Sequence, residues 1–237
     1  AITAGMDYAR GDAVVVIDGA SNQVTDTIDL GVPAHFLFHY APTNRLYCGF
    51  RGSGDRGIVV VDGKADTLIA TLELDRQPWA MCGSPARGLV FCSAGVQDGV
   101  VIAIDPVGDS VVRVQPVGVL DPVAICYNPT SDRVYCAGYA ESLYVLTGAG
   151  DSVVGVIAMP YEYARHPMQM ACSPVSNRVY YAGQVDARRG LFAVVDCGGD
   201  SLVAVLPAGE DPFDLVLNPA SNTVGCLNKY SDDLTVV

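Results

Sequence analysis

Aromatic and arginine side chains are interleaved in several polar segments of this chain of 237 residues. A ring with a polar tip offers apolar contact area, and a guanidinium offers a planar fork of donors, so the combination is typical of surfaces that bind a protein, a peptide or a carbohydrate. The candidate ligand-binding residues are Arg76, Trp79, Tyr139, Tyr161, Tyr163, Arg165, His166, Arg188 and Arg189. Arg51, Arg56 and Tyr230 belong to the same set of segments. The alternative interpretation is solvated loops whose tyrosines pack over neighbouring parts of the fold.

The three histidines do not indicate a metal site, because none lies near a cysteine or a carboxylate at ligand spacing. His39 falls in an apolar stretch and is interpreted as a satisfied strand histidine. His166 precedes Pro167 in the longest connection and is the better functional candidate. Since extra loop length on a rigid scaffold is where function tends to be added, we predict that a ligand would contact the long segments 160–167 and 184–190.

Sequence motifs for catalysis are missing. There is no nucleophile elbow, no Ser/His/Asp order and no glycine-rich phosphate loop followed by a helix. Acids four residues apart, such as Asp62 and Asp66, lack the third acid and the distal glutamate of a calcium loop, so they are interpreted as capped turns. We assign no catalytic residue, no metal ligand and no cofactor, and a non-catalytic protein is favoured over an enzyme.

The elements that must position the candidate residues come from an internal repeat, best seen in residues 127–157. Short β-branched and aromatic runs alternate there with turn formers, which predicts four antiparallel strands. The end of the third strand recurs at residues 18, 62, 105, 147 and 196, a spacing of 42 to 49 residues. A four-stranded unit at this period predicts the blade of a β-propeller.

The predicted fold class is therefore all-β, a β-propeller of four-stranded antiparallel blades with five to six blades and about 43–45 residues per repeat. We expect one domain over residues 1–237, with a partial blade at each end. The expected units are a partial blade 1–30, blades at about 33–74, 77–117, 121–158 and 166–207, and a partial blade 213–237.

The repeat also resembles a known family. Its pattern Pro-x-Ser/Thr-Asn-Arg-Φ-Tyr, then Val-x-Val-Ile-Asp, then Asp/Asn-x-Val, is similar over essentially the whole chain to the YVTN family of β-propeller repeats. The name-giving tetrapeptide keeps only its first residue at Tyr47, Tyr135 and Tyr180. The resemblance implies a propeller that is extracellular, at the cell surface or periplasmic. Members of the family do many things, so it implies no particular activity.

Charge and hydropathy exclude some partners. The net charge is −12 and the only lysines are Lys64 and Lys229, which argues against nucleic acid, whose phosphates need a basic face. No apolar run approaches the roughly 20 residues of a membrane helix, so no membrane insertion is expected. The chain begins at Ala1 without a leader sequence, which we interpret as a processed form or an excised segment.

The eight cysteines are mostly explained by the repeat. Cys48, Cys92, Cys136 and Cys226 share one position in the second strand of each unit, which indicates small buried apolar residues. About the hairpin turns, Cys82 is expected to face Cys92 and Cys126 to face Cys136. Disulfides Cys82–Cys92 and Cys126–Cys136 are therefore conceivable, although disulfide geometry is demanding and free thiols are favoured.

The leading functional hypothesis is a non-catalytic extracellular or surface binding module. One alternative is a lyase or hydrolase with its site at the channel mouth; another is an excised or designed repeat fragment that assembles through its terminal strands. Residues 1–30 lack an inner strand, which 213–218 could supply, leaving 223–237 over. Otherwise the tail forms a sixth blade, or pairs with another chain. We favour the sixth blade, because the tail continues the repeat in register.

Overall fold

The structure is a computed structural model that describes residues 2–3, 12–52, 54–139, 142–159, 166–186 and 189–237, with the backbone alone for 2–3 and 166–168. The regular structure in this part of the chain consists of strands and one 3-10 turn, η1 (Ala41–Thr43). None of the described segments forms a helix long and apolar enough to cross a bilayer.

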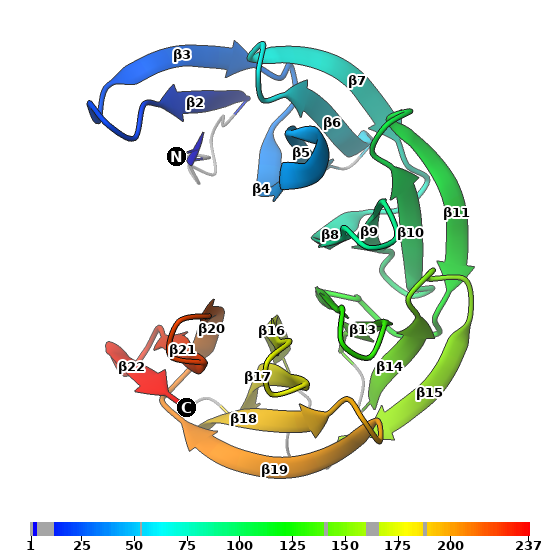
Figure 1. The fold of residues 1–237 in the computed structure, drawn as a ribbon, viewed down its shortest axis with the longest axis vertical. Coiled ribbons are helices and arrows are strands. Elements are labelled where there is room, and N and C mark those ends of the chain that lie inside the picture. Colours follow the sequence, from blue (N-terminus) through cyan, green and yellow to red (C-terminus); the bar gives the residue numbers. More distant parts are fainter. Residues whose placement is uncertain (1, 4–11, 53, 140–141, 160–165, 187–188) are drawn as a thin grey trace.

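Six antiparallel sheets follow one another along the chain and stand radially around a central space (Figure 1). We number them blades one to six. Blade one consists of β1 (Ile2–Thr3), β2 (Ala13–Ile17) and β3 (Val24–Asp29), and blade two of β4 (Ala34–Tyr40), β5 (Arg45–Arg51), β6 (Arg56–Asp62) and β7 (Thr67–Glu73). Blade three consists of β8 (Pro78–Ser84), β9 (Leu89–Ala94), β10 (Val100–Asp105) and β11 (Ser110–Pro116), and blade four of β12 (Ala124–Asn128), β13 (Arg133–Ala137), β14 (Ser142–Thr147) and β15 (Val153–Ala158). Blade five consists of β16 (His166–Ser173), β17 (Arg178–Asp186), β18 (Arg189–Asp196) and β19 (Ser201–Ala208), and blade six of β20 (Pro212–Asn218), β21 (Thr223–Asn228) and β22 (Asp233–Val236).

Within each blade the strands pair in chain order. In blades two, three and five the first strand borders the central space and the fourth lies outermost (Figure 1). This radial arrangement of antiparallel sheets is a β-propeller, so the predicted fold class is confirmed, with six blades.

The hairpins end where a residue adopts the left-handed conformation. Asn44, Asp132 and Asn177 close the turns between first and second strands with φ near 50°, a conformation that Asn and Asp tolerate better than other side chains. The acids that end the third strands cap the next turns: Asp62 Oδ1 accepts hydrogen bonds from the backbone N–H groups of residues 64 and 65. They are therefore turn-capping residues, as expected, and no group of three potential metal ligands occurs in the described segments.

The core lies between blades, and one repeat position dominates it. Tyr47, Phe91, Tyr135 and Tyr180 occupy this position in blades two to five, and each packs in the cluster between its own blade and the next. In blade six the residue at this position is Gly225. Consequently the face of blade six that points away from blade five carries no large aromatic side chain at its centre.

Ionic contacts on the turn side of the strands join blades two to five, and two of the three occupy equivalent repeat positions. The three pairs are Arg45 with Asp109, Arg87 with Asp132, and Arg133 with Asp200. In each pair the arginine comes from one blade and the aspartate from a turn of the next. Because they lie near the surface, such pairs contribute modestly to stability.

All eight cysteines are free. The two disulfides considered above are excluded by register: Cys82 pairs with Phe91 and Cys126 with Tyr135, one residue away from the expected partners. Because successive side chains point to opposite faces of a sheet, Cys92 and Cys136 point away from Cys82 and Cys126. Burial raises the pKa of Cys136 to about 12, as expected of a core thiol.

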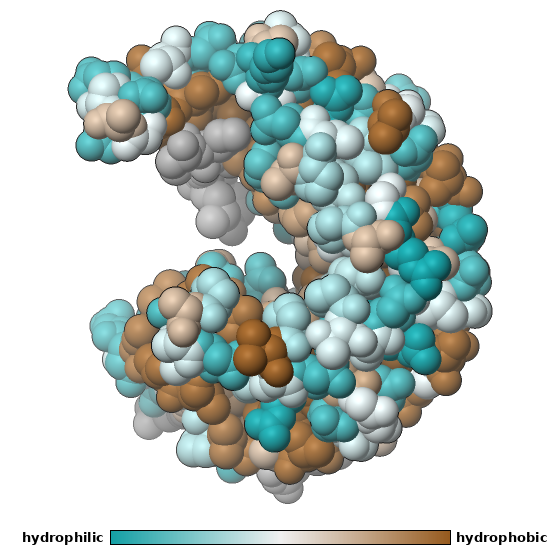
Figure 2. Space-filling view, in the orientation of Figure 1, coloured by the Kyte–Doolittle hydropathy of each residue, from teal (hydrophilic) through white to brown (hydrophobic). Residues whose placement is uncertain are grey.

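The two ends of the chain form separate blades. β20 pairs with β21 and begins a sheet of its own, so residues 213–218 do not supply the inner strand of blade one, and the sixth-blade alternative is confirmed. The terminal blades do not meet at a seam, however: the molecule is C-shaped, with an opening between blades one and six (Figures 1 and 2).

Candidate ligand-binding face

The loops of the propeller divide between two faces. Connections between second and third strands, and those leading from one blade to the next, emerge on one side, which we call the loop face. Turns between first and second strands, and between third and fourth strands, emerge on the other, the turn face. Arg76 lies in the connection between β7 and β8, Trp79 at the start of β8 and Tyr139 just after β13, so all three are on the loop face.

Blades two, three and six each have a β-bulge near the start of the first strand. The pairing of first with second strand shifts by one residue there, and the extra residue is His35, Trp79 or Phe213. A bulge of this kind redirects a side chain, and bulges are common beside functional sites. The bulges therefore place one ring from each of these blades at the loop-face end of the inner strands.

Arg51 forms a cation–π contact with Trp79, its guanidinium carbon 4.1 Å from the ring centroid. Arg51 ends the second strand of blade two, so the contact bridges blades two and three. The indole is fixed in turn, since Trp79 Nε1 donates a hydrogen bond of 2.6 Å to the carbonyl of Gly95. Arg51 Nη1 is buried and has no hydrogen-bond partner among the residues that the structure describes.

In the described part of the chain, the groups that act on Arg51 supply little negative charge. Burial lowers the pKa of Arg51, and the Tyr139 hydroxyl opposes this, while the guanidinium stays charged at any ordinary pH. Burial and the nearby charge of Arg51 both lower the pKa of His35, so its imidazole is neutral at pH 7. Arg56, another cation, stands directly opposite Arg51 in the strand pairing. In the described segments no carboxylate forms a hydrogen bond or ion pair with Arg51.

The adjoining loops are held by hydrogen bonds. Arg76 Nη1 donates to the carbonyl of Asp98 at 3.1 Å, and Arg76 Nε lies 3.9 Å from an Asp75 carboxylate oxygen. The backbone N–H of Tyr139 donates to the carbonyl of Leu120 at 2.8 Å. The side chain of Arg76 is thus bonded to its neighbours in the chain and in blade three, whereas Trp79 contacts Arg51.

Candidate residues from blade five cannot be assigned to this cluster. Tyr161, Tyr163, Arg165 and Arg188 lie outside the described residues, and His166 is described only by its backbone, as the first residue of β16. Arg189 Nε pairs with Asp186 Oδ2 at 2.6 Å. The prediction that a ligand contacts these segments stays a prediction.

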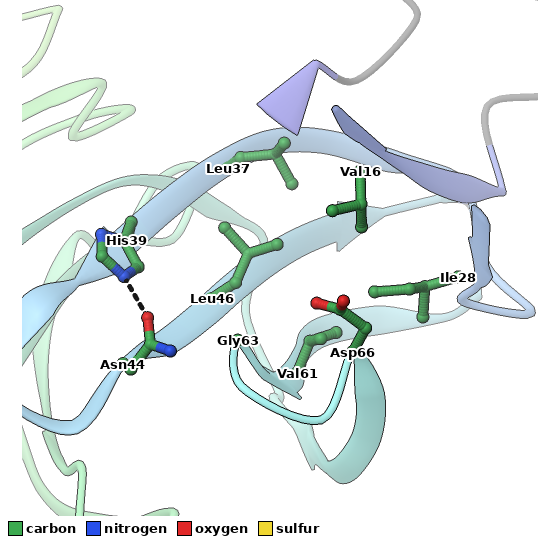
Figure 3. A pocket seen from close by; sticks show the side chains of 9 residues that line it. All are labelled: Val16, Ile28, Leu37, His39, Asn44, Leu46, Val61, Gly63 and Asp66. Atoms are coloured by element: carbon green, nitrogen blue, oxygen red, sulfur yellow. Dashed lines mark hydrogen bonds between the residues drawn. The ribbon is translucent and has the colours of Figure 1, made fainter. Parts of the chain in front are cut away.

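A cavity of about 500 Å³ opens on the turn face between blades one and two (Figure 3). Its walls are mostly aliphatic, and His39 Nε2 is satisfied there by Asn44 Oδ1 at 2.9 Å. At the interface between blades two and three, Gly83 is the counterpart of His39. The ring of Tyr40 fills the corresponding space there and lies against the position that a Cβ on Gly83 would take. We interpret the cavity as packing space that a first strand in blade one would fill, because the described part of that blade starts at its second strand.

The sequence groups Arg51 with the polar segments that carry the candidate residues, but Arg51 was not among the predicted ligand-binding residues. Its repeat position is held by Gly95, Tyr139, Gln184 and Lys229 in blades three to six. In blade six, Lys229 Nζ lies 5.8 Å from the ring centroid of Phe213, so a rim cation beside a bulged aromatic residue occurs twice. A polar position inside an otherwise apolar repeat was the signal that could have selected Arg51.

Comparison with solved structures places the chain among β-propellers. It is similar to Kuenenia stuttgartiensis hydrazine synthase, with a TM-score of 0.76 and 18% identity over 95% of this chain and 77% of that chain. It is also similar to the Dos1 propeller, with a TM-score of 0.74 and 10% identity over 94% of this chain and 62% of that one. A chain of a mitotic checkpoint complex gives a TM-score of 0.72 and 15% identity over 95% of this chain and 68% of that chain. At these identities the likeness shows the fold alone. No protein-family model matches the chain, and no curated protein matches it.

Proposed function

We propose that this β-propeller is a non-catalytic binding module that engages a protein, peptide or carbohydrate partner through its loop face. The observation that carries the proposal is the Arg51–Trp79 pair: a partly buried guanidinium held against an anchored indole, without a carboxylate partner among the described residues. Tryptophan and arginine are the side chains that most often dominate binding energy at interfaces. We further propose a place in the YVTN repeat family and a location outside the cytoplasm, both supported by the repeat pattern alone.

Arrays of neutral and acidic oligosaccharides and peptides test this function. The wild-type protein is compared with a loop-face variant, Arg51→Ala with Trp79→Ala, and with Lys64→Ala, which removes an exposed cation from the turn face. We expect binding that the loop-face variant loses and Lys64→Ala keeps. Binding that survives the loop-face change would contradict the proposal. A chemically altered ligand recovered after incubation would favour the enzyme alternative.

A further inference from the structure

The charge balance around Arg51 is the opposite of the charge balance of the whole protein. The chain carries 26 acidic and 14 basic residues, yet Arg51 has no acid partner among the described residues and Arg56 is its cross-strand neighbour. Like charges directly opposite one another in a strand pair are unfavourable. A partly buried cation without a counter-charge is also unfavourable, so this arrangement suits an anion supplied from outside.

We propose that Arg51 and Trp79 form a receptor for a carboxylate group of the ligand, an inference that rests on the proposed function and names the chemistry of its site. A guanidinium matches a planar carboxylate through two parallel N–H···O bonds. A guanidinium that stacks on an indole keeps its in-plane donors free, and the distance of 4.1 Å between the Arg51 guanidinium carbon and the Trp79 ring centroid fits such a contact. Trp79 thereby orients the fork while its own N–H is used by Gly95.

A carboxylate suits the site better than a phosphate. Phosphate sites in proteins are usually built from several backbone N–H groups in a nest or at a helix N-terminus, or from a lysine with a glycine-rich loop. Neither lysine of the chain is near: Lys64 lies on the turn face, and Lys229 is in blade six. His35 is neutral at pH 7, so it adds no charge to that of Arg51.

Trp79 is the only tryptophan of the chain, so its fluorescence reports on this site without a label. The probes are two matched pairs at constant ionic strength: D-galacturonate against D-galactose, and N-acetylglutamate amide against N-acetylglutamine amide. We expect the fluorescence of Trp79 to change saturably with at least one of the acids and not to change with the neutral counterpart of that acid. A response to galacturonate alone assigns the carboxylate to a sugar acid, and a response to the glutamate derivative alone assigns it to an acidic side chain. Saturation with neither acid, an equal response to a neutral counterpart, or tighter binding of inorganic phosphate overturns the proposal.

Three variants separate a specific receptor from diffuse charge, with calorimetry as a readout independent of the indole. Arg51→Gln should lower the affinity for the acid by roughly ten- to a hundredfold. Arg51→Lys should lower it by less, since lysine keeps the positive charge but lacks the planar fork of donors. Lys229→Gln removes the same charge from the equivalent repeat position and should leave affinity unchanged. Equal losses in Arg51→Gln and Lys229→Gln overturn the proposal. Circular dichroism and thermal unfolding confirm that each variant is folded.

Glu141 lies outside the described residues and is tested as an internal counter-charge. If Glu141→Gln binds the acid probe as tightly as the wild-type protein does, an external anion is supported as the counter-charge of Arg51. A tenfold or larger gain in affinity would show that Glu141 supplies this counter-charge, and would overturn the inference. The two proposals fail separately. If array binding depends on the loop face but no carboxylate probe binds, the binding module stands and the carboxylate receptor falls; if array binding ignores the loop face, the proposed function itself falls.

Discussion

The hydroxyl of Tyr135 in blade four donates a hydrogen bond of 2.7 Å to Asp200 Oδ1 in a turn of blade five. The ring of Tyr135 is fully buried in the core between these blades. The aromatic residue that fills this interface therefore also ties it to the following turn. Burial raises the pKa of Tyr135, so the phenol remains a hydrogen-bond donor at all ordinary pH values.

Tyr135→Phe should lower the free energy of unfolding by about 1.5–3 kcal/mol, because the lost hydrogen bond has a charged acceptor. The measurement is urea denaturation followed by circular dichroism. Tyr144→Phe is the matched control, since among the described residues the Tyr144 hydroxyl makes only a long contact of 3.5 Å, with the carbonyl of residue 118. Equal losses in the two variants would refute the special role of Tyr135.

Buried thiols should make the protein sensitive to alkali. Burial raises the pKa of Cys48 and of Cys136 to about 12, above the ordinary value of about 9. Unfolded thiols therefore lose their protons first, so the unfolded state is favoured increasingly as pH rises from about 9 towards 12. We expect the urea midpoint to fall between pH 8 and pH 10.5, and to fall less in a Cys48→Ala, Cys136→Ala variant. A midpoint that is equally pH-dependent in both proteins would contradict this origin.

The same burial predicts slow chemical labelling. Cys48, Cys136 and Cys226 are fully buried, so a thiol reagent should require denaturant to reach them. Cys136→Ser should lower the free energy of unfolding by roughly 1–3 kcal/mol, since it buries a hydroxyl without an assured partner. Rapid labelling of all three thiols in the native protein would end the core interpretation.

Two glycines at strand positions should respond in opposite ways to a methyl group. A Cβ at Gly83 would lie 2.7 Å from the Tyr40 ring, whereas at Gly225 its nearest neighbour, a methyl of Leu234, is 3.6 Å away. We expect Gly83→Ala to destabilise by about 1–3 kcal/mol through overpacking, and Gly225→Ala to stabilise by about 0.5–1 kcal/mol by restricting the unfolded chain. Thermal unfolding of both variants checks this, and stabilisation by Gly83→Ala would refute the packing of Tyr40.

The outer face of blade six should drive self-association of the chain. The side chains of Val216, Leu227, Leu234 and Val236 are more than half exposed there, and brown surface gathers over this part of the molecule in Figure 2. Exposed apolar faces and unpaired strand edges promote association. Val216→Thr with Leu234→Thr should shift the mass measured by light scattering at high concentration towards the monomer, without lowering the melting temperature. A wild-type chain that stays monomeric at these concentrations would contradict the prediction.

The repeat allowed the sequence to predict the strands and the turn chemistry, because each depends on local periodicity and on residues such as Asn44 and Asp62. It could not place Cys82 against the correct partner, since a single residue of turn length decides the register and reverses every side chain. The contact of Arg51 with Trp79 was also beyond reach. It depends on a bulge in one blade and on the spacing between two blades, and neither leaves a periodic signal.

The C-shaped arrangement gives the molecule two ends in a structural sense, where a closed ring has none. Inner blades are supported by a neighbour on either side, whereas blades one and six each pack on a single neighbour. In such an array, the free energy needed to unfold one blade is approximately the sum of its own stability and of its contacts with adjacent blades. Amide hydrogen exchange should therefore be slowest in β9, β10, β13 and β14 and become faster towards both termini. Arg51 and Trp79 join blades two and three, so the proposed receptor lies one blade in from an end of the array, and a ligand bound there would slow exchange in blade two above all.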